Sequence, residues 1–269
     1  MEKVRPNTVK QKLQSGRPVF DVRISIPDPD LVEIAGRAGV DAIWIDGEHS
    51  NFDWDRALSC VLAAELHGMM PILRPPELAG HREYMIRRAL DIGFQGIVVT
   101  GVSNREEMRR ILDVILFPPR GKRGVGEGRV FFRAGELDPT VLQAMNDEIF
   151  VLVLIETAEG VEKIDEICAM DGVHAAGLGH RDYALDAGLP DFSLEQPAME
   201  DAIRRVSEAA LRHGKASTGS AATIESFAQS RRAGALYFSL GRETKTWQKT
   251  CERVSELRAN GLDTRGRSS

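Results

Sequence analysis

Residues 30–50 read DLVEIAGRAGVDAIWIDGEHS, and this stretch indicates how the chain folds. Its first part predicts a helix over Asp30–Ala38, because its apolar residues recur at helical spacing. Gly39 follows, where a left-handed helix C-cap is expected. The apolar run Ala42–Ile45 then predicts a buried strand, and polar residues, Asp46–His49, come directly after it. The stretch therefore contains a helix, a strand and a polar turn in close succession.

The same alternation continues in both directions along the chain. Strands are predicted over Val19–Ile24, Ala42–Ile45, Pro71–Leu73, Gly96–Val99, Phe150–Ile155, Ala175–Leu178, Ala216–Thr218 and Leu236–Leu240. Helices are predicted over Asp30–Ala38, Asp53–His67, Glu83–Leu90, Asn104–Leu116, Glu159–Met170, Met199–His213, Thr223–Ala233 and Glu243–Leu257. Such strand-then-helix units predict one TIM (β/α)8 barrel over residues 1–260, followed by a disordered tail over residues 261–269. A doubly wound open sheet is the alternative architecture.

Composition narrows the classes of protein. The 269 residues carry a net charge of −5, which argues against a nucleic-acid-binding domain. No apolar run is long enough to span a membrane, and the N-terminus lacks the apolar core of a signal peptide. The three cysteines are widely spaced and predict neither a disulfide framework nor a zinc site. We therefore expect a cytoplasmic protein whose partners are small molecules.

Two predicted strands end in residues that suit catalysis, and TIM barrels carry their active sites at these strand ends. The second strand runs into Asp46-Gly47-Glu48-His49, which favours a general base with an orienting network. The alternative is a polar loop with an ordinary helix cap. The third strand ends in Arg74, which is suited to holding an oxyanion or a carboxylate. A salt bridge from Arg74 to Asp46 or Glu48 is the other interpretation, and the two are compatible.

The fifth and sixth predicted strands lead to Glu156 and Asp182. Two carboxylates from neighbouring strand ends, with water completing the shell, suit Mg²⁺ or Mn²⁺ rather than structural zinc. The alternative is that each carboxylate caps the helix that follows it. The glycine-rich segment Pro118–Pro139 is predicted to be a long functional or mobile loop.

The same positions carry a family resemblance. The stretches AGVDAIWIDGEHS, PILRP, ALDIGFQGIVV, PPRGKRGVG, LIETAEGVE and GLGHRDYALDAGL resemble the HpcH/HpaI aldolase family from about Gly16 to Leu257. The resemblance implies a TIM barrel of the phosphoenolpyruvate/pyruvate-domain type. It also implies a class II aldolase, which cleaves a 4-hydroxy-2-keto acid to pyruvate, or a close 2-keto acid, and an aldehyde through a metal-stabilised enolate. Glu156 and Asp182 match the ligands of the divalent metal, for which Mg²⁺, Mn²⁺ and Co²⁺ are candidates.

Further roles are implied only by this resemblance. His49 matches the acid/base histidine, and Asp91 matches an aspartate that supports it. Arg74 matches the arginine that stabilises the enolate or the developing alkoxide, and Glu48 matches a residue that hydrogen-bonds metal-bound water. The family is commonly trimeric or hexameric, so a homo-oligomer is expected.

The sequence departs from the family pattern beside both predicted metal ligands. Leu154 stands where a glutamine is usual, and His180-Arg181 replaces a small pair after Gly179. Backbone amides at that turn normally receive the keto-acid carboxylate, so Arg181 could meet a second carboxylate. The departures leave open a related barrel lyase, acting as an oxaloacetate decarboxylase or on a malyl- or citryl-CoA-type thioester. A barrel without catalysis is the third hypothesis, which the retained candidate ligands, histidine and arginine disfavour.

Overall fold

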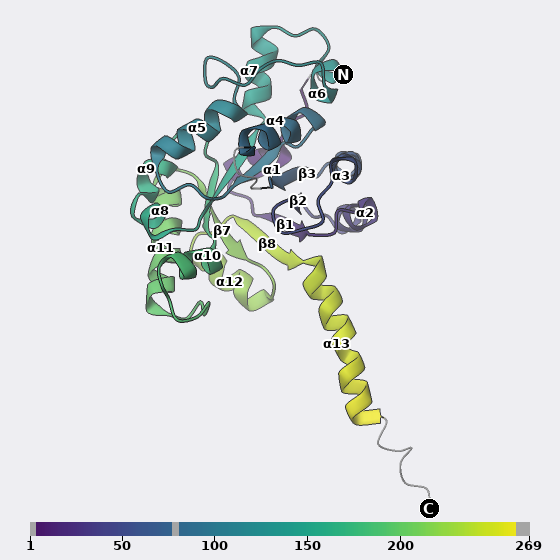
Figure 1. Cartoon of the computed structure of the whole chain (residues 1–269), viewed down its shortest axis with the longest axis vertical. Coiled ribbons are helices and arrows are strands. Elements are labelled where there is room, and N and C mark those ends of the chain that lie inside the picture. Colours follow the sequence, from purple (N-terminus) through teal and green to yellow (C-terminus); the bar gives the residue numbers. More distant parts are fainter. Residues whose placement is uncertain (1–3, 77–80, 262–269) are drawn as a thin grey trace, which may run out of the picture.

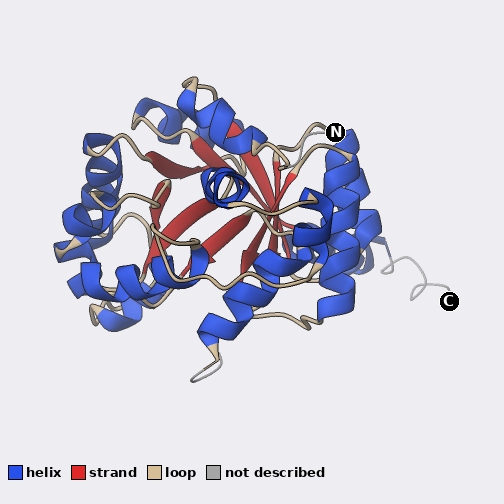
Figure 2. Cartoon of the chain, turned by 90° about the horizontal axis from the view of Figure 1, so that it is seen from above, coloured by secondary structure: helices blue, strands red, loops and turns tan. Residues whose placement is uncertain are grey.

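The computed structural model describes residues 4–76 and 81–261, and its centre is a closed barrel of parallel strands (Figures 1 and 2). Within those residues the strands are β1 (Val19–Ile24), β2 (Ala42–Asp46), β3 (Met70–Arg74), β4 (Gly96–Val99), β5 (Phe150–Ile155), β6 (Ala175–Leu178), β7 (Ala216–Ser220) and β8 (Tyr237–Arg242). Each strand pairs with the next, and β1 pairs with β8. The predicted TIM barrel is confirmed, and this closure excludes the open sheet.

Helices connect the strands and surround the barrel, as Figure 2 shows from above. They are α1 (Thr8–Gln14), α2 (Pro29–Arg37), α3 (Trp54–Leu66), α4 (Arg82–Ile92), α5 (Arg105–Ile115), α6 (Arg129–Ala134), α7 (Pro139–Asp147), α8 (Ala158–Glu162), α9 (Ile164–Cys168), α10 (His180–Asp186), α11 (Pro197–Arg212), α12 (Ile224–Arg232) and α13 (Glu243–Gly261). None of the helices in the described residues is long and apolar enough to cross a membrane.

The structure differs from the predicted helices and from the predicted loop. The predicted helix Glu159–Met170 is divided into α8 and α9 at Lys163, which ends one helix and begins the next. The segment Pro118–Pro139 is not a continuous loop, because α6 lies within it and packs Phe131 against Phe117. Helices α1, α7 and α10 were not predicted either. Helices α1 and α10 are only seven residues long, and α7 directly follows the predicted loop. From residue 262 onward, the predicted tail lies outside the described residues.

The barrel interior is filled by apolar side chains from alternate strand positions. Residues of β2, β3 and β5, including Trp44, Ile72 and Leu152, form one buried cluster there. Val9 of α1 belongs to the same cluster, so α1 closes the amino end of the barrel. The other face of each strand packs against the surrounding helices in a larger cluster. The amino end of the barrel is therefore closed by α1. The carboxyl ends of the strands carry polar residues such as Asp46 and Arg74, so a site can form there.

Helix α13 departs from the usual barrel arrangement. It continues directly from β8 but projects away from the barrel instead of packing on it (Figure 1). Its apolar side chains are exposed, including Trp247 at 69% and Leu257 at 70%. Exposed large apolar residues grouped on one helix are typical of an interaction surface.

Candidate active site

A buried ion pair joins the carboxyl ends of β2 and β3. Asp46 and Arg74 are register partners at the ends of these adjacent strands. Arg74 Nε and Nη2 donate to the two carboxylate oxygens of Asp46 at 3.0 and 2.6 Å. Arg74 Nη1 lies 2.9 Å from Glu48 Oε2. Burial alone would raise the pKa of Asp46, but the hydrogen bonds and charge of Arg74 outweigh it and lower that pKa.

The Asp46 carboxylate also fixes the turn that follows β2. Its Oδ1 accepts hydrogen bonds from the backbone N–H groups of Glu48 and His49, at 3.1 and 3.2 Å. Gly47 allows this close turn, because an added Cβ would lie 2.8 Å from the Arg74 carbonyl oxygen. The His49 side chain is 61% exposed and lies 3.9 Å from Glu48. The structure thus brings together Glu48, His49 and Arg74, and Arg74 forms both of the salt bridges considered from the sequence.

The two predicted metal ligands come from adjacent strands on the other side of the barrel mouth. Glu156 follows β5, and Asp182 lies in the first turn of α10 after β6. Glu156 packs against Gly179 so closely that an added Cβ there would lie 2.5 Å from it. Neither carboxylate caps a helix, since Thr157 caps α8 and α10 has no side-chain cap. The capping alternative is therefore wrong for both residues.

Burial raises the pKa of Glu156 to about 7. The N–H of Gly101, which donates to Glu156 Oε2 at 3.3 Å, opposes this shift, while the charges of Asp182 and Glu48 add to it. A half-buried carboxylate that is repelled by two others has the environment of a cation ligand, because a bound cation offsets both the desolvation and the repulsion.

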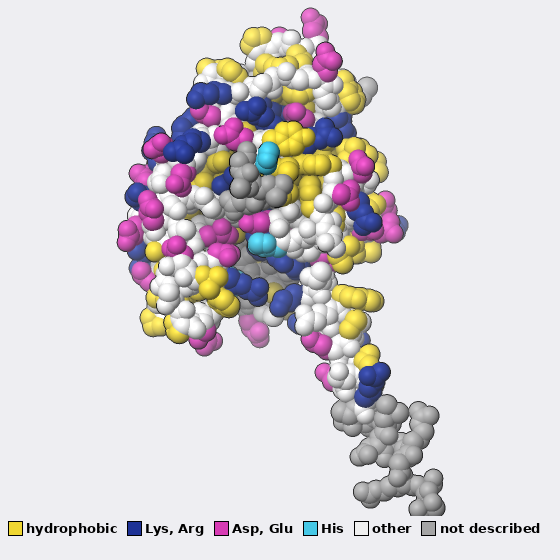
Figure 3. Space-filling view, in the orientation of Figure 1, with side chains coloured by type: hydrophobic (Ala, Val, Ile, Leu, Met, Phe, Trp, Pro, Cys, Tyr) yellow, Lys and Arg dark blue, Asp and Glu magenta, His cyan; other side chains and the backbone are white. Residues whose placement is uncertain are grey.

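The oxygen-rich surroundings of Glu156 fit a hard divalent cation such as Mg²⁺ or Mn²⁺. In the described part of the chain, no three carboxylate, histidine or cysteine side chains are grouped closely enough to form a complete metal-binding cluster. A cation at Glu156 and Asp182 would therefore take further ligands from water and substrate, as Mg²⁺ commonly does. Figure 3 shows acidic side chains and Lys or Arg side chains next to one another at the centre of this face.

The predicted substrate-binding residues lie beside Glu156. Leu154 is buried in the inner cluster of the barrel, two residues before Glu156 on the same side of β5. Gly179 donates its N–H to the Ile155 carbonyl at 2.7 Å, so its contribution is space for Glu156 rather than a free donor. His180 is half-buried, and burial and the charge of Arg181 lower its pKa. Arg181 itself is exposed.

Asp91 is not brought to His49 within one chain. It lies near the end of α4, which leads into the amino end of β4, whereas His49 follows the carboxyl end of β2. Asp91 Oδ1 instead pairs with Arg123 Nη2 at 2.8 Å. The Arg123 guanidinium is buried and lies over the Phe117 ring, 4.6 Å from its centre. In a single chain Asp91 therefore anchors the segment before α6 and cannot support His49.

Two arginines at the mouth were missed from the sequence. Arg242 at the end of β8 lies 3.6 Å from Asp46 Oδ2. Arg23 near the end of β1 pairs in register with Trp44 and with Arg242. A charged residue at an inward position of the apolar run Val19–Ile24 was the available signal for Arg23.

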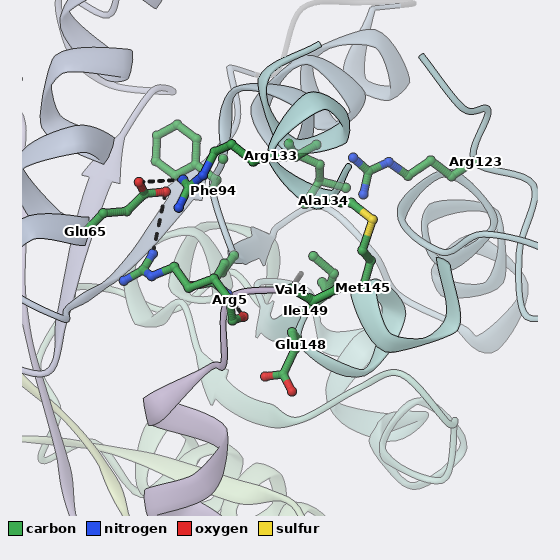
Figure 4. Close-up of a pocket in the computed structure, with 14 residues that line it drawn as sticks. Val4, Arg5, Glu65, Phe94, Arg123, Arg133, Ala134, Met145, Glu148 and Ile149 are labelled. Carbon is green, nitrogen blue, oxygen red and sulfur yellow. Dashed lines mark hydrogen bonds and ion pairs between the residues drawn. The ribbon is translucent and has the colours of Figure 1, made fainter. Parts of the chain in front are cut away.

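A separate cavity of about 110 Å³ lies near the amino ends of β4 and β5 (Figure 4). Arg5 and Arg133 point toward Glu65 there, and Arg5 Nη1 lies 3.8 Å from Glu65 Oε1. None of the predicted site residues lines this cavity. The candidate active site is the polar mouth at the opposite end of the barrel.

Comparison with known proteins agrees with this geometry. Residues 24–249 match the model of the HpcH/HpaI aldolase/citrate lyase family. A Deinococcus radiodurans protein named hydroxypyruvate/pyruvate aldolase is 34% identical over 204 residues, covering 74% of this chain and 72% of that protein. A Shigella sonnei protein named 4-hydroxy-2-oxo-heptane-1,7-dioate aldolase is 30% identical over 252 residues, covering 93% and 94%. A solved HpcH/HpaI aldolase from Desulfitobacterium hafniense superposes with a TM-score of 0.82 at 30% identity, covering 93% of this chain and 96% of that one.

The barrel fold, the family model and the names of these relatives together define the class of protein, a carbon–carbon lyase built on a TIM barrel. The chain belongs to the HpcH/HpaI aldolase/citrate lyase family. The predicted family and the predicted class of enzyme, a class II aldolase, are confirmed.

We predict that Mg²⁺ binding strengthens as pH rises toward 7. The metal-free Glu156 carboxyl has a pKa of about 7, so at lower pH the cation must displace a proton. Calorimetric titration should show the dissociation constant falling by about tenfold per pH unit below that pKa. The same pKa also links the stability of the metal-free protein to pH. The contribution of Glu156 to the free energy of unfolding is fully present below pH 4.5, the pKa of an unperturbed glutamate, and it is lost as pH rises through about 7.

The matched control is Glu156→Gln, which should bind Mg²⁺ weakly and with little dependence on pH. Equal affinity of the unmodified protein at pH 6 and pH 8 would contradict the assignment of Glu156 as a ligand.

Proposed function

We propose that this enzyme reversibly cleaves a 4-hydroxy-2-keto acid to pyruvate, or a close 2-keto acid, and an aldehyde. The observation that carries the proposal is the half-buried carboxylate Glu156, which lies with Asp182 at the same barrel mouth as the fixed guanidinium of Arg74. The names of the two curated relatives, both aldolases of keto acids, support the substrate class.

Glu156 and Asp182 are the residues that would hold a divalent cation, Mg²⁺, Mn²⁺ or Co²⁺. When bound, such a cation supplies Lewis-acid polarisation of the keto group. Glu48 lies on the Arg74 side and contributes to the charge around Glu156, which suits a residue that hydrogen-bonds water in the coordination shell. The first-turn amides of His180 and Arg181 are suited to the keto-acid carboxylate, because helix N-termini attract anions.

Arg74 and His49 have complementary roles in the proposed reaction. Asp46 and Glu48 fix the orientation of the Arg74 guanidinium, so it can offset negative charge on the substrate oxygen without rearranging. His49 is exposed at the mouth while its backbone is held by Asp46, which leaves its ring accessible to substrate. In cleavage, His49 would take the proton of the C4 hydroxyl group and, once the aldehyde has left, deliver it to the carbon that becomes the pyruvate methyl group. In synthesis the same two proton transfers run in reverse.

We further propose a cytoplasmic homo-oligomer, a trimer or a hexamer. Helix α13 exposes Trp247, Val254 and Leu257, and the occupant that fits this surface is a second copy of the chain. An oligomer also offers the one route by which Asp91 could support His49, since the two residues lie at opposite ends of one barrel. Cys60 and Cys168 are buried free thiols, which suits a reducing compartment.

Exchange of pyruvate methyl protons in D₂O, followed by NMR, tests the proposed chemistry. We expect exchange with Mg²⁺ or Mn²⁺ and loss of exchange with EDTA, because removal of a methyl proton is half of the proposed aldol reaction. His49→Ala and Asp182→Ala should each lower the rate at least about a hundredfold, the size of a typical acid–base contribution. Lys249→Gln, on the exposed surface of α13, is the control for handling and metal content. Full exchange in Asp182→Ala would show that the metal assignment is wrong.

The oligomer is tested by sedimentation of the whole chain. We expect a trimer or a hexamer, which Trp247→Glu combined with Leu257→Glu should dissociate, because burying two carboxylates in an apolar contact is costly. Lys249→Glu places a comparable charge on the same helix and should leave the assembly intact. A monomeric unmodified protein, or an unchanged assembly in the double variant, would refute the role of α13.

A further inference from the structure

The cavity near the amino ends of β4 and β5 lies at the opposite end of the barrel from the candidate active site. Helices α6 and α7 and the residues just before the two strands supply its walls (Figure 4). Phe94, Met145 and Ile149 give it an apolar side. Its volume is about 110 Å³. Because a cavity of about 150 Å³ holds a benzene molecule, this one has room for about four to six non-hydrogen atoms.

The described residues that line this cavity have unused hydrogen-bonding capacity. Arg5 Nη1, Gln95 Oε1 and Arg123 Nε are each buried without a hydrogen-bond partner. The amide nitrogen of Gln95 is used, since it donates to the Arg5 carbonyl at 2.7 Å. The Arg123 side chain is 2% exposed, and its Nη2 donates to Asp91 at 2.8 Å. Leaving buried donors and acceptors unpaired costs free energy, so a polar ligand that pairs with them would be stabilised.

One side of the cavity carries excess positive charge. Arg5, Arg129 and Arg133 all pair with the carboxylate of Glu65, with Arg5 Nη1 at 3.8 Å and Arg133 Nη1 at 2.7 Å. Three guanidinium groups therefore share one carboxylate. Burial lowers the pKa of Arg5, Glu65 opposes the shift, and the charges of Arg133 and Arg129 add to it. A negatively charged group of a ligand would balance this side.

A second carboxylate in the lining, Glu148, does not balance the charge. Figure 4 shows that it points away from both Arg133 and Arg123. Its Oε2 accepts a hydrogen bond from the backbone N–H of Asn7. The same view places the Arg123 guanidinium on the opposite side of the pocket from Arg133. The cavity thus has a cationic side, an apolar side and separate polar atoms that need partners.

We propose that this cavity is a second ligand site, which binds a small monocarboxylic acid carrying a hydroxyl group. The carboxylate binds beside Arg5 and Arg133. The hydroxyl group donates to Gln95 Oε1, and its oxygen remains free to accept from Arg123 Nε, because a hydroxyl group both donates and accepts. The short carbon chain of the ligand contacts the apolar side. This site does not depend on the proposed aldolase reaction, whose residues lie at the other end of the barrel.

Calorimetry of the whole chain with three small probes, L-lactate, propionate and propane-1,2-diol, tests the inference. EDTA is present throughout, so that no probe binds a cation at the barrel mouth. We expect L-lactate to bind with a dissociation constant of about 1 mM or below, which is within the reach of very small ligands. Propionate lacks the hydroxyl group and should bind about two- to tenfold more weakly. The diol lacks the carboxylate and should bind at least about tenfold more weakly, because hydrogen bonds to charged groups are stronger.

Variants in the lining locate the bound probe. Arg5→Gln should weaken L-lactate binding at least about tenfold, through loss of a charged hydrogen bond. Gln95→Leu should leave propionate binding unchanged and remove the preference for L-lactate over propionate. The matched controls are Arg17→Gln, just before β1, and Gln229→Leu on α12. Both positions are exposed and lie outside the cavity lining, so both variants should bind all three probes as the unmodified protein does.

The inference is overturned if the unmodified protein does not bind L-lactate, since the cavity then holds water alone. Diol binding as tight as that of L-lactate would rule out an acid site, and equal binding of L-lactate and propionate would rule out the hydroxyl contact. Unchanged L-lactate affinity in both Arg5→Gln and Gln95→Leu would place the ligand elsewhere. If Arg5→Gln does not fold, Arg133→Gln decides, because Arg133 is 43% exposed and its loss leaves Glu65 paired with Arg129.

Discussion

The buried ion pair between Asp46 and Arg74 is the interaction on which the rest of the site depends. It joins the ends of two neighbouring strands and leaves both charges almost without solvent. Removing one partner of such a pair costs about 3–5 kcal/mol, because the other charge remains buried alone. The same Asp46 oxygen that binds Arg74 also binds the backbone of Glu48 and His49. One carboxylate therefore sets the positions of the arginine, the second carboxylate and the histidine.

Because the barrel closes, Arg74, Glu48 and His49 lie across its mouth from Glu156 and Asp182, which follow β5 and β6. Parallel strands place all their carboxyl ends at one rim, so residues far apart in sequence meet there. The rim is divided by charge: Glu156 and Asp182 form one side, and Arg23 and Arg242 form the other. Glycines at the rim serve this arrangement, since Gly179 leaves room for Glu156 and Gly47 allows the turn at Arg74.

Much of this could be predicted from the sequence, because the strands are short apolar runs followed directly by polar residues. All eight predicted strands correspond to strands of the barrel, and Glu48, His49, Arg74, Glu156 and Asp182 were identified from their positions after them. Arg23 was missed because it lies within an apolar run rather than after it, and its orientation depends on the register with Trp44. Asp91 was assigned from resemblance alone, and chain connectivity places it at the other end of the barrel. The spacing of apolar residues along one chain carries no information about contacts between two copies of it. Contacts within an oligomer therefore could not be predicted from the sequence.

The central claim is that Glu156 and Asp182 hold a divalent cation that is in direct contact with the keto acid. Electron paramagnetic resonance of bound Mn²⁺ with ¹⁷O-labelled pyruvate tests it most directly. The account predicts that the labelled oxygens broaden the Mn²⁺ lines in the unmodified enzyme, and that Glu156→Gln combined with Asp182→Asn abolishes tight Mn²⁺ binding. Tight Mn²⁺ binding in that double variant, or lines in the unmodified enzyme that the label does not change, would contradict it.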